Sequence, residues 1–444
     1  MKTIERSAET CVRERKGDIF IVKRNPDPAL HPFERAREYV RAVNAAKLDR
    51  LFAKPFVAAL QGHVDGVYCM NRHPTELKTL ASGAGDGELR LWDLSTKKCI
   101  WNRKEAHDAL IRGVCFLPNS TSMLSCSDDK VVKMWDYSSH SSAATEPMAL
   151  FRGKGTFTSI DSHRMGQLFA TAGSQEVALW DCSRAEALQA YSWGADTVNC
   201  VRFNQAESAL LASCASDRSL MIHDQRTSQT IAKVILKMRS NAVAWNPQEA
   251  FYLSAANEDG NVYTFDMRYF DRAINVMRGH VSAVLDLDYS PTGTEIATAG
   301  YDRSLRLFDV RAGNSRDIYH GQRMQRLFCV RFSTDSKYIF SGSDDGNVRI
   351  WKAHAAEQLG AKNHRQQDAL DYNSRVLERF KQMPEVRRIA THRRIPKDIK
   401  IRARNEHSHN ISQLRKEENR RRHSKPGSVP KSNIRNDAIV KVEK

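Results

Sequence analysis

Histidine, hydroxyl, carboxylate and tryptophan side chains recur in this sequence in a fixed order. The sets are His63, Ser82, Asp86 and Trp92; His107, Ser125, Asp129 and Trp135; and His280, Thr298 and Asp302, which lacks the tryptophan. A hydroxyl beside a histidine that a carboxylate orients is the arrangement of nucleophilic catalysis. Catalysis needs such a group once, whereas here it recurs along the chain. We therefore interpret each set as a buried hydrogen-bond chain and expect no catalytic residue.

The elements that position these sets end in a recurring tripeptide, in which an aromatic residue or histidine is followed by aspartate or, once, lysine. Seven such closings occur, 42 to 45 residues apart, and they are Leu91-Trp92-Asp93, Met134-Trp135-Asp136, Leu179-Trp180-Asp181, Ile222-His223-Asp224, Thr264-Phe265-Asp266, Leu307-Phe308-Asp309 and Ile350-Trp351-Lys352. This spacing is typical of four-stranded propeller blades. A single blade cannot bury both of its faces, so the repeats must pack into one closed ring.

The closings resemble those of the WD-repeat family over residues 56–352. In such propellers the strand before the first repeat belongs to the last blade. The resemblance therefore implies that residues 55–60 pair beside residues 347–351 and close the ring. We expect an all-β, seven-bladed WD-repeat β-propeller at 56–352, an extended and helical N-terminal arm at 1–55, and a basic, mainly helical domain at 353–444.

Charge separates the predicted ring from its flanks. Lys and Arg exceed Asp and Glu by 23 to 11 in residues 353–444 and by 13 to 8 in residues 1–55, which leaves 33 of each in the ring. The formal net charge of +17 therefore lies outside the propeller. A neutral platform with basic extensions is typical of a scaffold whose arms meet polyanions, above all nucleic acid. The alternative is a charged tail that is merely solvated.

The C-terminal segment contains two predicted helices. Between Asp368 and Met383, apolar residues fall on one side, and Pro384 ends the helix; this stripe should dock on the propeller or on a partner. A second helix is expected from Lys397 to about His423, with a thin apolar line and basic faces.

Phosphate contacts are expected along this second helix and just before it. The candidates, chosen by charge density, are Arg393, Arg394, Arg402, Arg404, Arg415, Lys416, Arg420, Arg421 and Arg422. No Phe, Tyr or Trp follows Phe380, so contact with the phosphates of shaped RNA is favoured over base stacking. The basic run 420–425 also has the density of a nuclear import sequence.

Composition argues against several classes of protein. There is no run of about 20 apolar residues, and residues 1–16 are too charged for a secretory signal. The 9 cysteines contain no Cys-x-x-Cys pair, which argues against a zinc site, and no glycine loop suited to phosphate is present. We expect no membrane contact, no metal, no cofactor and no small-molecule substrate.

Four further segments resemble the Sof-type WD-repeat proteins of ribosome biogenesis. They are Arg24–Phe33, a proline-rich stretch that should be extended and precede a short helix at 34–50, Ala256–Asp259, Asp286–Gly293 and His423–Pro430. The resemblance covers nearly the whole chain. It implies a nuclear, nucleolar, non-catalytic scaffold of the small-subunit processome. Its implied partners are processome proteins, the U-three small nucleolar RNP and pre-rRNA, and its implied role is in processing toward small-subunit rRNA.

A second class of function is indicated by an Arg two residues after the closing Asp in three successive repeats. The pairs are Asp224 and Arg226, Asp266 and Arg268, and Asp309 and Arg311. This is similar to the motif with which WD-repeat substrate receptors dock on the damaged-DNA-binding adaptor of cullin-RING (CUL-four type) ubiquitin ligases. The alternative is that each Arg pairs with its Asp or with a neighbouring blade.

Overall fold

The computed structural model describes residues 33–118, 121–137, 146–192, 196–227, 229–429, 431 and 433–443. The expected extended stretch at 24–33 lies outside these residues, apart from Phe33. The chain divides into two compact units, residues up to 53 with 358–392, and 54–357 with 393–444.

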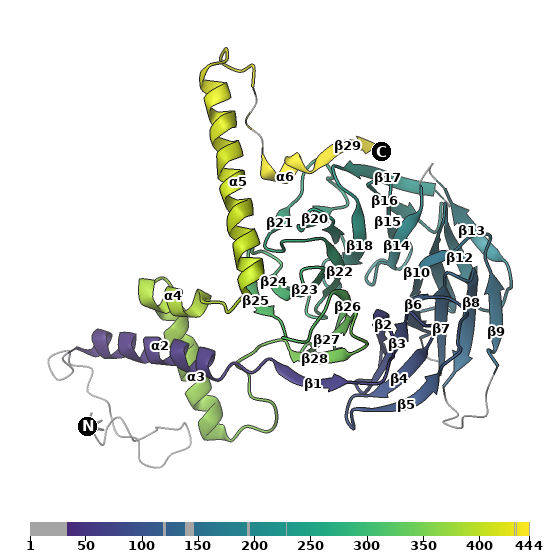
Figure 1. Ribbon diagram of the computed structural model, residues 1–444, viewed down its shortest axis with the longest axis horizontal. Helices are drawn as coiled ribbons and strands as arrows, with labels where there is room; N and C mark the ends of the chain where they lie inside the picture. The colour runs from purple at the N-terminus through teal and green to yellow at the C-terminus, as the bar shows by residue number, and fades with distance from the viewer. Residues whose placement is uncertain are drawn as a thin grey trace. The chain divides into compact units, whose positions relative to one another are not determined.

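The described part of the larger unit forms seven antiparallel sheets, which are the blades of the propeller (Figure 1). In chain order the strands are β1 (Phe56–Leu60), β2 (Val67–Arg72), β3 (Thr79–Ala84), β4 (Leu89–Asp93), β5 (Lys98–Arg103), β6 (Ile111–Phe116), β7 (Ser122–Ser127), β8 (Val131–Asp136), β9 (Ala149–Arg152), β10 (Phe157–Ser162), β11 (Leu168–Gly173), β12 (Val177–Asp181), β13 (Ala187–Tyr191), β14 (Val198–Phe203), β15 (Leu210–Ala215), β16 (Ser219–Asp224), β17 (Gln229–Leu236), β18 (Ser240–Trp245), β19 (Tyr252–Asn257), β20 (Val262–Asp266), β21 (Asn275–Met277), β22 (Val284–Tyr289), β23 (Glu295–Gly300), β24 (Leu305–Asp309), β25 (Ser315–Tyr319), β26 (Leu327–Phe332), β27 (Tyr338–Ser343), β28 (Val348–Lys352) and β29 (Ile439–Glu443). Blade one is β2 to β5, each following blade takes the next four strands, and the seventh is β26, β27, β28 and β1.

The ring is closed by pairing the first strand with the last. β1 runs antiparallel to β28, with Phe56 opposite Trp351 and Leu60 opposite Val348. Lys352 N also donates to Pro55 O at 2.8 Å. The sequence prediction of a seven-bladed propeller that closes through these residues is confirmed.

The core of the ring lies between the blades. Leu60, Trp92 and Phe340, all buried, form one such cluster where blade seven meets blade one. Inner strands such as β3 and β7 are buried at all six residues, because neighbouring blades cover both faces of each sheet. Stability therefore depends on closure of the whole ring rather than on any one blade.

The smaller unit consists of three helices, α2 (Glu34–Leu51), α3 (His364–Arg379) and α4 (Pro384–Thr391). Its core contains small residues of α2 packed against apolar residues of the other two, namely Ala42, Val43, Ala46, Val376 and Val386, with Tyr39, Leu377, Phe380 and Ile389 at the edge. Arg379 Nη1 pairs with Glu38 Oε2 at 2.8 Å.

This packing corrects the expected docking of the stripe at 368–383. Leu377 and Phe380 pack against the N-terminal helix, whereas Leu370 and Met383 stay exposed. Residues 358–392 of the C-terminal segment belong to this helical unit, because α3 and α4 bury their apolar faces on α2.

The remaining C-terminal elements belong to the larger unit. They are α5 (Lys397–Arg422), α6 (Ile434–Asp437) and β29. The bounds of α5 agree with the predicted basic helix. In Figure 1, α5 rises beside β24 and β25, and the chain then returns through α6 to β29 at the edge of β17.

Candidate functional site

Blade two contains the complete hydrogen-bond chain. Trp135 Nε1 donates to Ser125 Oγ at 2.8 Å, and this hydroxyl lies 2.7 Å from His107 Nε2. His107 Nδ1 lies 2.7 Å from Asp129 Oδ2. A carboxylate only accepts, so Nδ1 carries the proton and Nε2 accepts from the serine. Every group in the set is satisfied, and the four side chains tie the blade together.

Blade one is held in the same way by a different acid, which corrects the prediction of Asp86. His63 Nε2 lies 2.7 Å from Ser82 Oγ, but His63 Nδ1 lies 3.1 Å from Glu88 Oε2. The exposed Asp86 instead accepts from Glu88 N at 3.1 Å within the turn. Glu88 starts two residues further along and is longer by one methylene, so its carboxylate reaches the imidazole and is fixed there by Arg90 Nη2 at 2.7 Å.

The other blades keep parts of the chain. In blade six, His280 lies 2.7 Å from Thr298 Oγ1 and 3.1 Å from Asp302 Oδ2, while Phe308 offers no N–H. Blade four places His223 where a tryptophan is expected, with His223 Nε2 2.8 Å from Ser213 Oγ. The sequence places His223 at the closing position that tryptophan fills elsewhere, but its hydrogen bond to Ser213 was not predicted.

Accessibility supports a structural role for these sets. The hydroxyl residues Ser82, Ser125 and Thr298 are each 0% exposed. A nucleophile must reach its substrate, and these cannot. Among the described residues, no group of three or more His, Cys, Asp or Glu is placed to hold a metal ion, and none of the described helices is long and apolar enough to cross a membrane.

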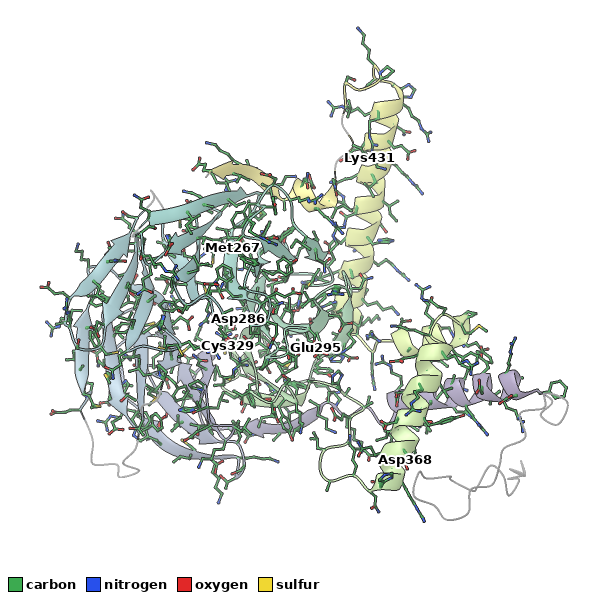
Figure 2. All side chains as sticks on the ribbon, turned by 180° about the vertical axis from the view of Figure 1, so that it is seen from behind. Met267, Asp286, Glu295, Cys329, Asp368 and Lys431 are labelled. Atoms are coloured by element: carbon green, nitrogen blue, oxygen red, sulfur yellow. The ribbon has the colours of Figure 1, made fainter. Side chains whose placement is uncertain are left out.

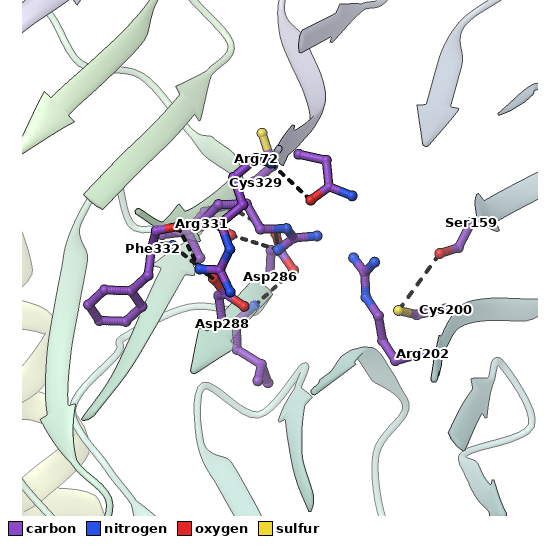
Figure 3. A network of polar contacts seen from close by, with 12 residues as sticks. Arg72, Ser159, Cys200, Arg202, Asp286, Asp288, Cys329, Arg331 and Phe332 are labelled. Carbon is purple, nitrogen blue, oxygen red and sulfur yellow. Dashed lines mark hydrogen bonds and ion pairs between the residues drawn. The ribbon is translucent and has the colours of Figure 1, made fainter. Parts of the chain in front are cut away.

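The axis of the ring contains a cavity of about 120 Å³, lined by residues of the first strand of each blade. Asp286 and Cys329, labelled in Figure 2, both line it. Figure 3 shows that the carboxylates there reach from one blade to the next: Asp286 Oδ2 accepts from Val330 N at 3.0 Å and pairs with Arg331 at 2.8 Å. Asp288 Oδ2 accepts from Phe332 N at 2.8 Å.

These axial groups join neighbouring blades and have little reactivity. The carboxylates around the cavity face arginines, as Asp161 faces Arg202 at 3.4 Å, so the charges are matched. Burial raises the pKa of the Cys69 thiol to about 12 and that of Cys329 well above its ordinary value. Both thiols therefore stay protonated, which is the less nucleophilic form. The cavity is best explained as the space that the innermost strands of the seven blades leave at the axis of the ring.

The predicted phosphate contacts are gathered on and beside α5. Arg402, Arg404, Arg415, Lys416, Arg420 and Arg422 are exposed, and Arg421 is half-buried. The helix contains nine Lys or Arg and four Asp or Glu, and Ile399 is its one buried residue among those described. Arg422 pairs with Glu418 at 2.9 Å, one turn away, as the spacing predicts. The helix therefore exposes basic side chains to solvent along most of its length.

Arg393 and Arg394 lie at the root of this helix. His320 Nε2 donates to Arg394 O at 2.9 Å, which ties the root to the end of β25. Arg394 is exposed and Arg393 half-buried. The structure thus places all nine candidates on one continuous segment.

The three Asp-x-Arg pairs follow β16, β20 and β24, and they differ in geometry. Arg268 Nε and Nη2 donate to the two carboxylate oxygens of Asp266 at 3.0 and 2.8 Å, and its guanidinium stacks 4.4 Å above the Phe251 ring. Arg226 N donates to Asp224 Oδ1 at 2.8 Å, and the side chain of Arg226 is exposed.

The third pair is looser. Asp309 is 3.6 Å from Arg316, and Arg311 is exposed. The side chains of Arg226 and Arg311 are therefore exposed, whereas the guanidinium of Arg268 donates two hydrogen bonds to its own aspartate. Pairing of the Arg with its own Asp was the alternative given for these residues from the sequence.

Known families match both parts of the chain. Residues 353–439 match the Sof1-like domain, and residues 54–93, 97–136, 272–309 and 313–352 match the WD domain, G-beta repeat. The described residues between these matched repeats form the further blades of the ring.

Three relatives illustrate the similarity over full length. "DDB1- and CUL4-associated factor 13" of Xenopus laevis is 48% identical over 431 residues, 97% of this chain and 96% of the relative. The Homo sapiens protein of the same name is 47% identical over 445 residues, 100% of both chains. "Protein SOF1" of Saccharomyces cerevisiae is 45% identical over 424 residues, 90% of this chain and 86% of the relative. The chain therefore belongs to the Sof1 family of WD-repeat proteins.

Proposed function

We propose that this protein is a non-catalytic scaffold of the small-subunit processome in the nucleolus. It associates with the U-three small nucleolar RNP and is required for processing pre-rRNA to small-subunit rRNA. Membership of the Sof1 family supports this role. The observation that carries it is the contrast between an electrically neutral ring and α5, whose basic side chains are exposed.

The two parts have different tasks in this scaffold. A neutral ring with closed, buried cores suits contact with processome proteins through its loops. The basic helix suits the phosphates of RNA, because arginine forks match phosphate oxygens and the helix has no Phe, Tyr or Trp with which to stack bases. At about 1.5 Å per residue, α5 spans roughly 40 Å, enough to follow several successive phosphates.

The salt dependence of RNA binding tests the role of α5. Replacing Arg402, Arg404 and Arg415 by Gln removes three exposed cations and preserves helix propensity. The matched control replaces Lys98, Lys104 and Arg152, which are exposed on the ring. Each lost phosphate contact should reduce the slope of log affinity against log salt by about 0.7 to 0.9. An unchanged slope in the α5 variant, or an equal reduction in the control, would reject the assignment.

A second function is favoured by the Asp-x-Arg pairs together with the names of the DDB1- and CUL4-associated relatives. In this reading the protein is a substrate receptor of a cullin-RING ubiquitin ligase and docks on the adaptor through Asp224, Arg226, Asp266, Arg268, Asp309 and Arg311. The exposed Arg226 and Arg311 suit a partner carboxylate or carbonyl. The docking residues of the ring are different from the candidate phosphate contacts of α5, so RNA binding and adaptor binding are compatible.

A further inference from the structure

Blade four differs from the other blades because the C-terminus of the chain adds a strand to it. Among the described residues it is the one sheet with five strands, in the order β14, β15, β16, β17 and β29. β29 runs antiparallel to β17, with Val442 opposite Val234 and Ile439 opposite Leu236. The exposed edge of a strand is a template for another strand, and here the chain supplies its own.

Contacts before β29 fasten the same segment to two blades. Lys237 N donates to Ala438 O at 2.9 Å, and Ala273 N donates to Arg435 O at 3.1 Å. Lys237 lies at the outer edge of blade four, and Ala273 precedes the outer strand of blade five. Ala438 is buried, and Ile439 and Val442 pack against the core cluster shared by these blades. Residues 433–443 are therefore seated by backbone bonds and apolar contacts together.

The opposite end of the basic arm is also fastened. The bond from His320 to Arg394 and the burial of Ile399 fix the start of α5. Beyond Ile399 none of the described residues of this helix is fully buried, so packing along its length contributes little to holding it in place. Most helical stability in proteins comes from such packing. The position of α5 thus depends on its two ends.

We propose that residues 433–443 are a latch: the strand-accepting edge of blade four takes the C-terminal strand of its own chain and thereby holds the far end of α5. The arm is then a fixed rod and not a free tail. A rod that is ordered beforehand loses less conformational entropy when RNA binds, so latching raises RNA affinity without adding phosphate contacts. This last step rests on the proposed RNA-binding role of α5, whereas the latch itself does not.

A matched pair of substitutions in the full-length chain tests the latch. Val442→Asp places a charge where β29 packs on the core, and Val440→Asp places the same charge at a neighbouring position that is 60% exposed. Trypsin cleavage within 397–425, measured without RNA, should accelerate in Val442→Asp and stay at the parent rate in Val440→Asp. If one substitution leaves β29 seated, Ile439→Asp combined with Val442→Asp provides the stronger disruption. Parent-like cleavage in that double variant would overturn the latch.

RNA binding separates the latch from the proposed function. Val442→Asp should weaken RNA binding roughly three- to tenfold, because an unlatched α5 must become ordered when RNA binds. The salt slope should stay unchanged, because no phosphate contact is removed. Faster cleavage with unaltered affinity would overturn the coupling to RNA while the latch stands. A parent protein that binds no RNA would instead count against the proposed function, and the cleavage result would still decide the latch.

Discussion

Glu88 Oε2 lies 3.1 Å from His63 Nδ1 in the interior of blade one, and Glu88 Oε1 lies 2.7 Å from Arg90 Nη2. Burial by itself raises the pKa of Glu88, but the hydrogen bond and charge of Arg90, with the contribution of His63, lower it overall. The carboxylate is therefore charged at neutral pH. One acid orients a buried histidine and neutralises an arginine, so several groups depend on it.

Removing Glu88 should destabilise the ring more than removing Asp86. In Glu88→Ala the side chains of His63 and Arg90 both lose a partner, which costs about 2 to 3 kcal/mol of unfolding free energy. In Asp86→Ala an exposed turn loses one hydrogen bond, at a cost of about 1 kcal/mol or less. Urea unfolding of both variants measures the difference. Equal losses would mean that Asp86 shares the role assigned to Glu88.

Stability should fall in mild acid because of buried histidines. Burial lowers the pKa of His223 from its ordinary 6.5 to about 4. Below about pH 6.5 the unfolded chain therefore binds a proton at His223, whereas the folded chain does not. The contribution of neutral His223 to the free energy of unfolding is complete above that pH and is lost as pH falls toward 4.

His223→Gln should remove part of this pH dependence, because the amide can still meet Ser213 but does not titrate. Between about pH 7.5 and pH 5, the parent should lose on the order of 2 kcal/mol more unfolding free energy than the variant. His407→Gln, an exposed position on α5, is the control. The same acid sensitivity in all three proteins would show that His223 is not responsible.

Adaptor binding should depend on the arginines of the Asp-x-Arg pairs. Replacing Arg226, Arg268 and Arg311 by Ala should abolish recovery of the cullin adaptor in a pull-down and leave rRNA processing intact. Arg184→Ala, an exposed arginine in the equivalent turn of blade three, should have no effect. Undiminished adaptor recovery in the triple variant would remove the substrate-receptor hypothesis.

The helical unit should come apart when its α2 core is charged. Val43 is 8% exposed within the core that α2 forms with α3 and α4, whereas Val40 is 54% exposed on the same helix. Val43→Asp should speed hydrogen exchange throughout 364–391, and Val40→Asp should not. Equal exchange in the two variants would contradict the packing of α3 and α4 on α2.

The ring and the basic helix could be predicted from sequence because both depend on patterns of residues that lie close together in the chain. The closing residues such as Trp135 and Asp136 repeat at a nearly constant interval, which predicts the blades, while the closure by β1 was implied by the resemblance to WD-repeat propellers. The bounds of α5 follow from Pro396 before it and from charges spaced by turns, such as Glu418 and Arg422.

Contacts between distant segments could not be predicted in the same way. The choice of Glu88 over Asp86 depends on which carboxylate reaches His63 in three dimensions, and both lie in the same turn region. The pairing of β29 with β17 joins residues some two hundred positions apart, and a five-residue strand among helices has too short a pattern to reveal its partner. The packing of α2 against α3 likewise joins segments that lie before and after the propeller in the sequence.

The measurement that tests the scaffold most directly is a tagged pull-down from nuclear extract. It compares the full-length protein with the variant in which Arg402, Arg404 and Arg415 are Gln, and it quantifies co-purified pre-rRNA, the U-three small nucleolar RNP and proteins. We expect the parent to recover the RNA and processome proteins, and the variant to keep the proteins that bind the ring while losing most of the RNA. Equal RNA recovery by both, or recovery of the cullin adaptor without RNA by the parent, would contradict it.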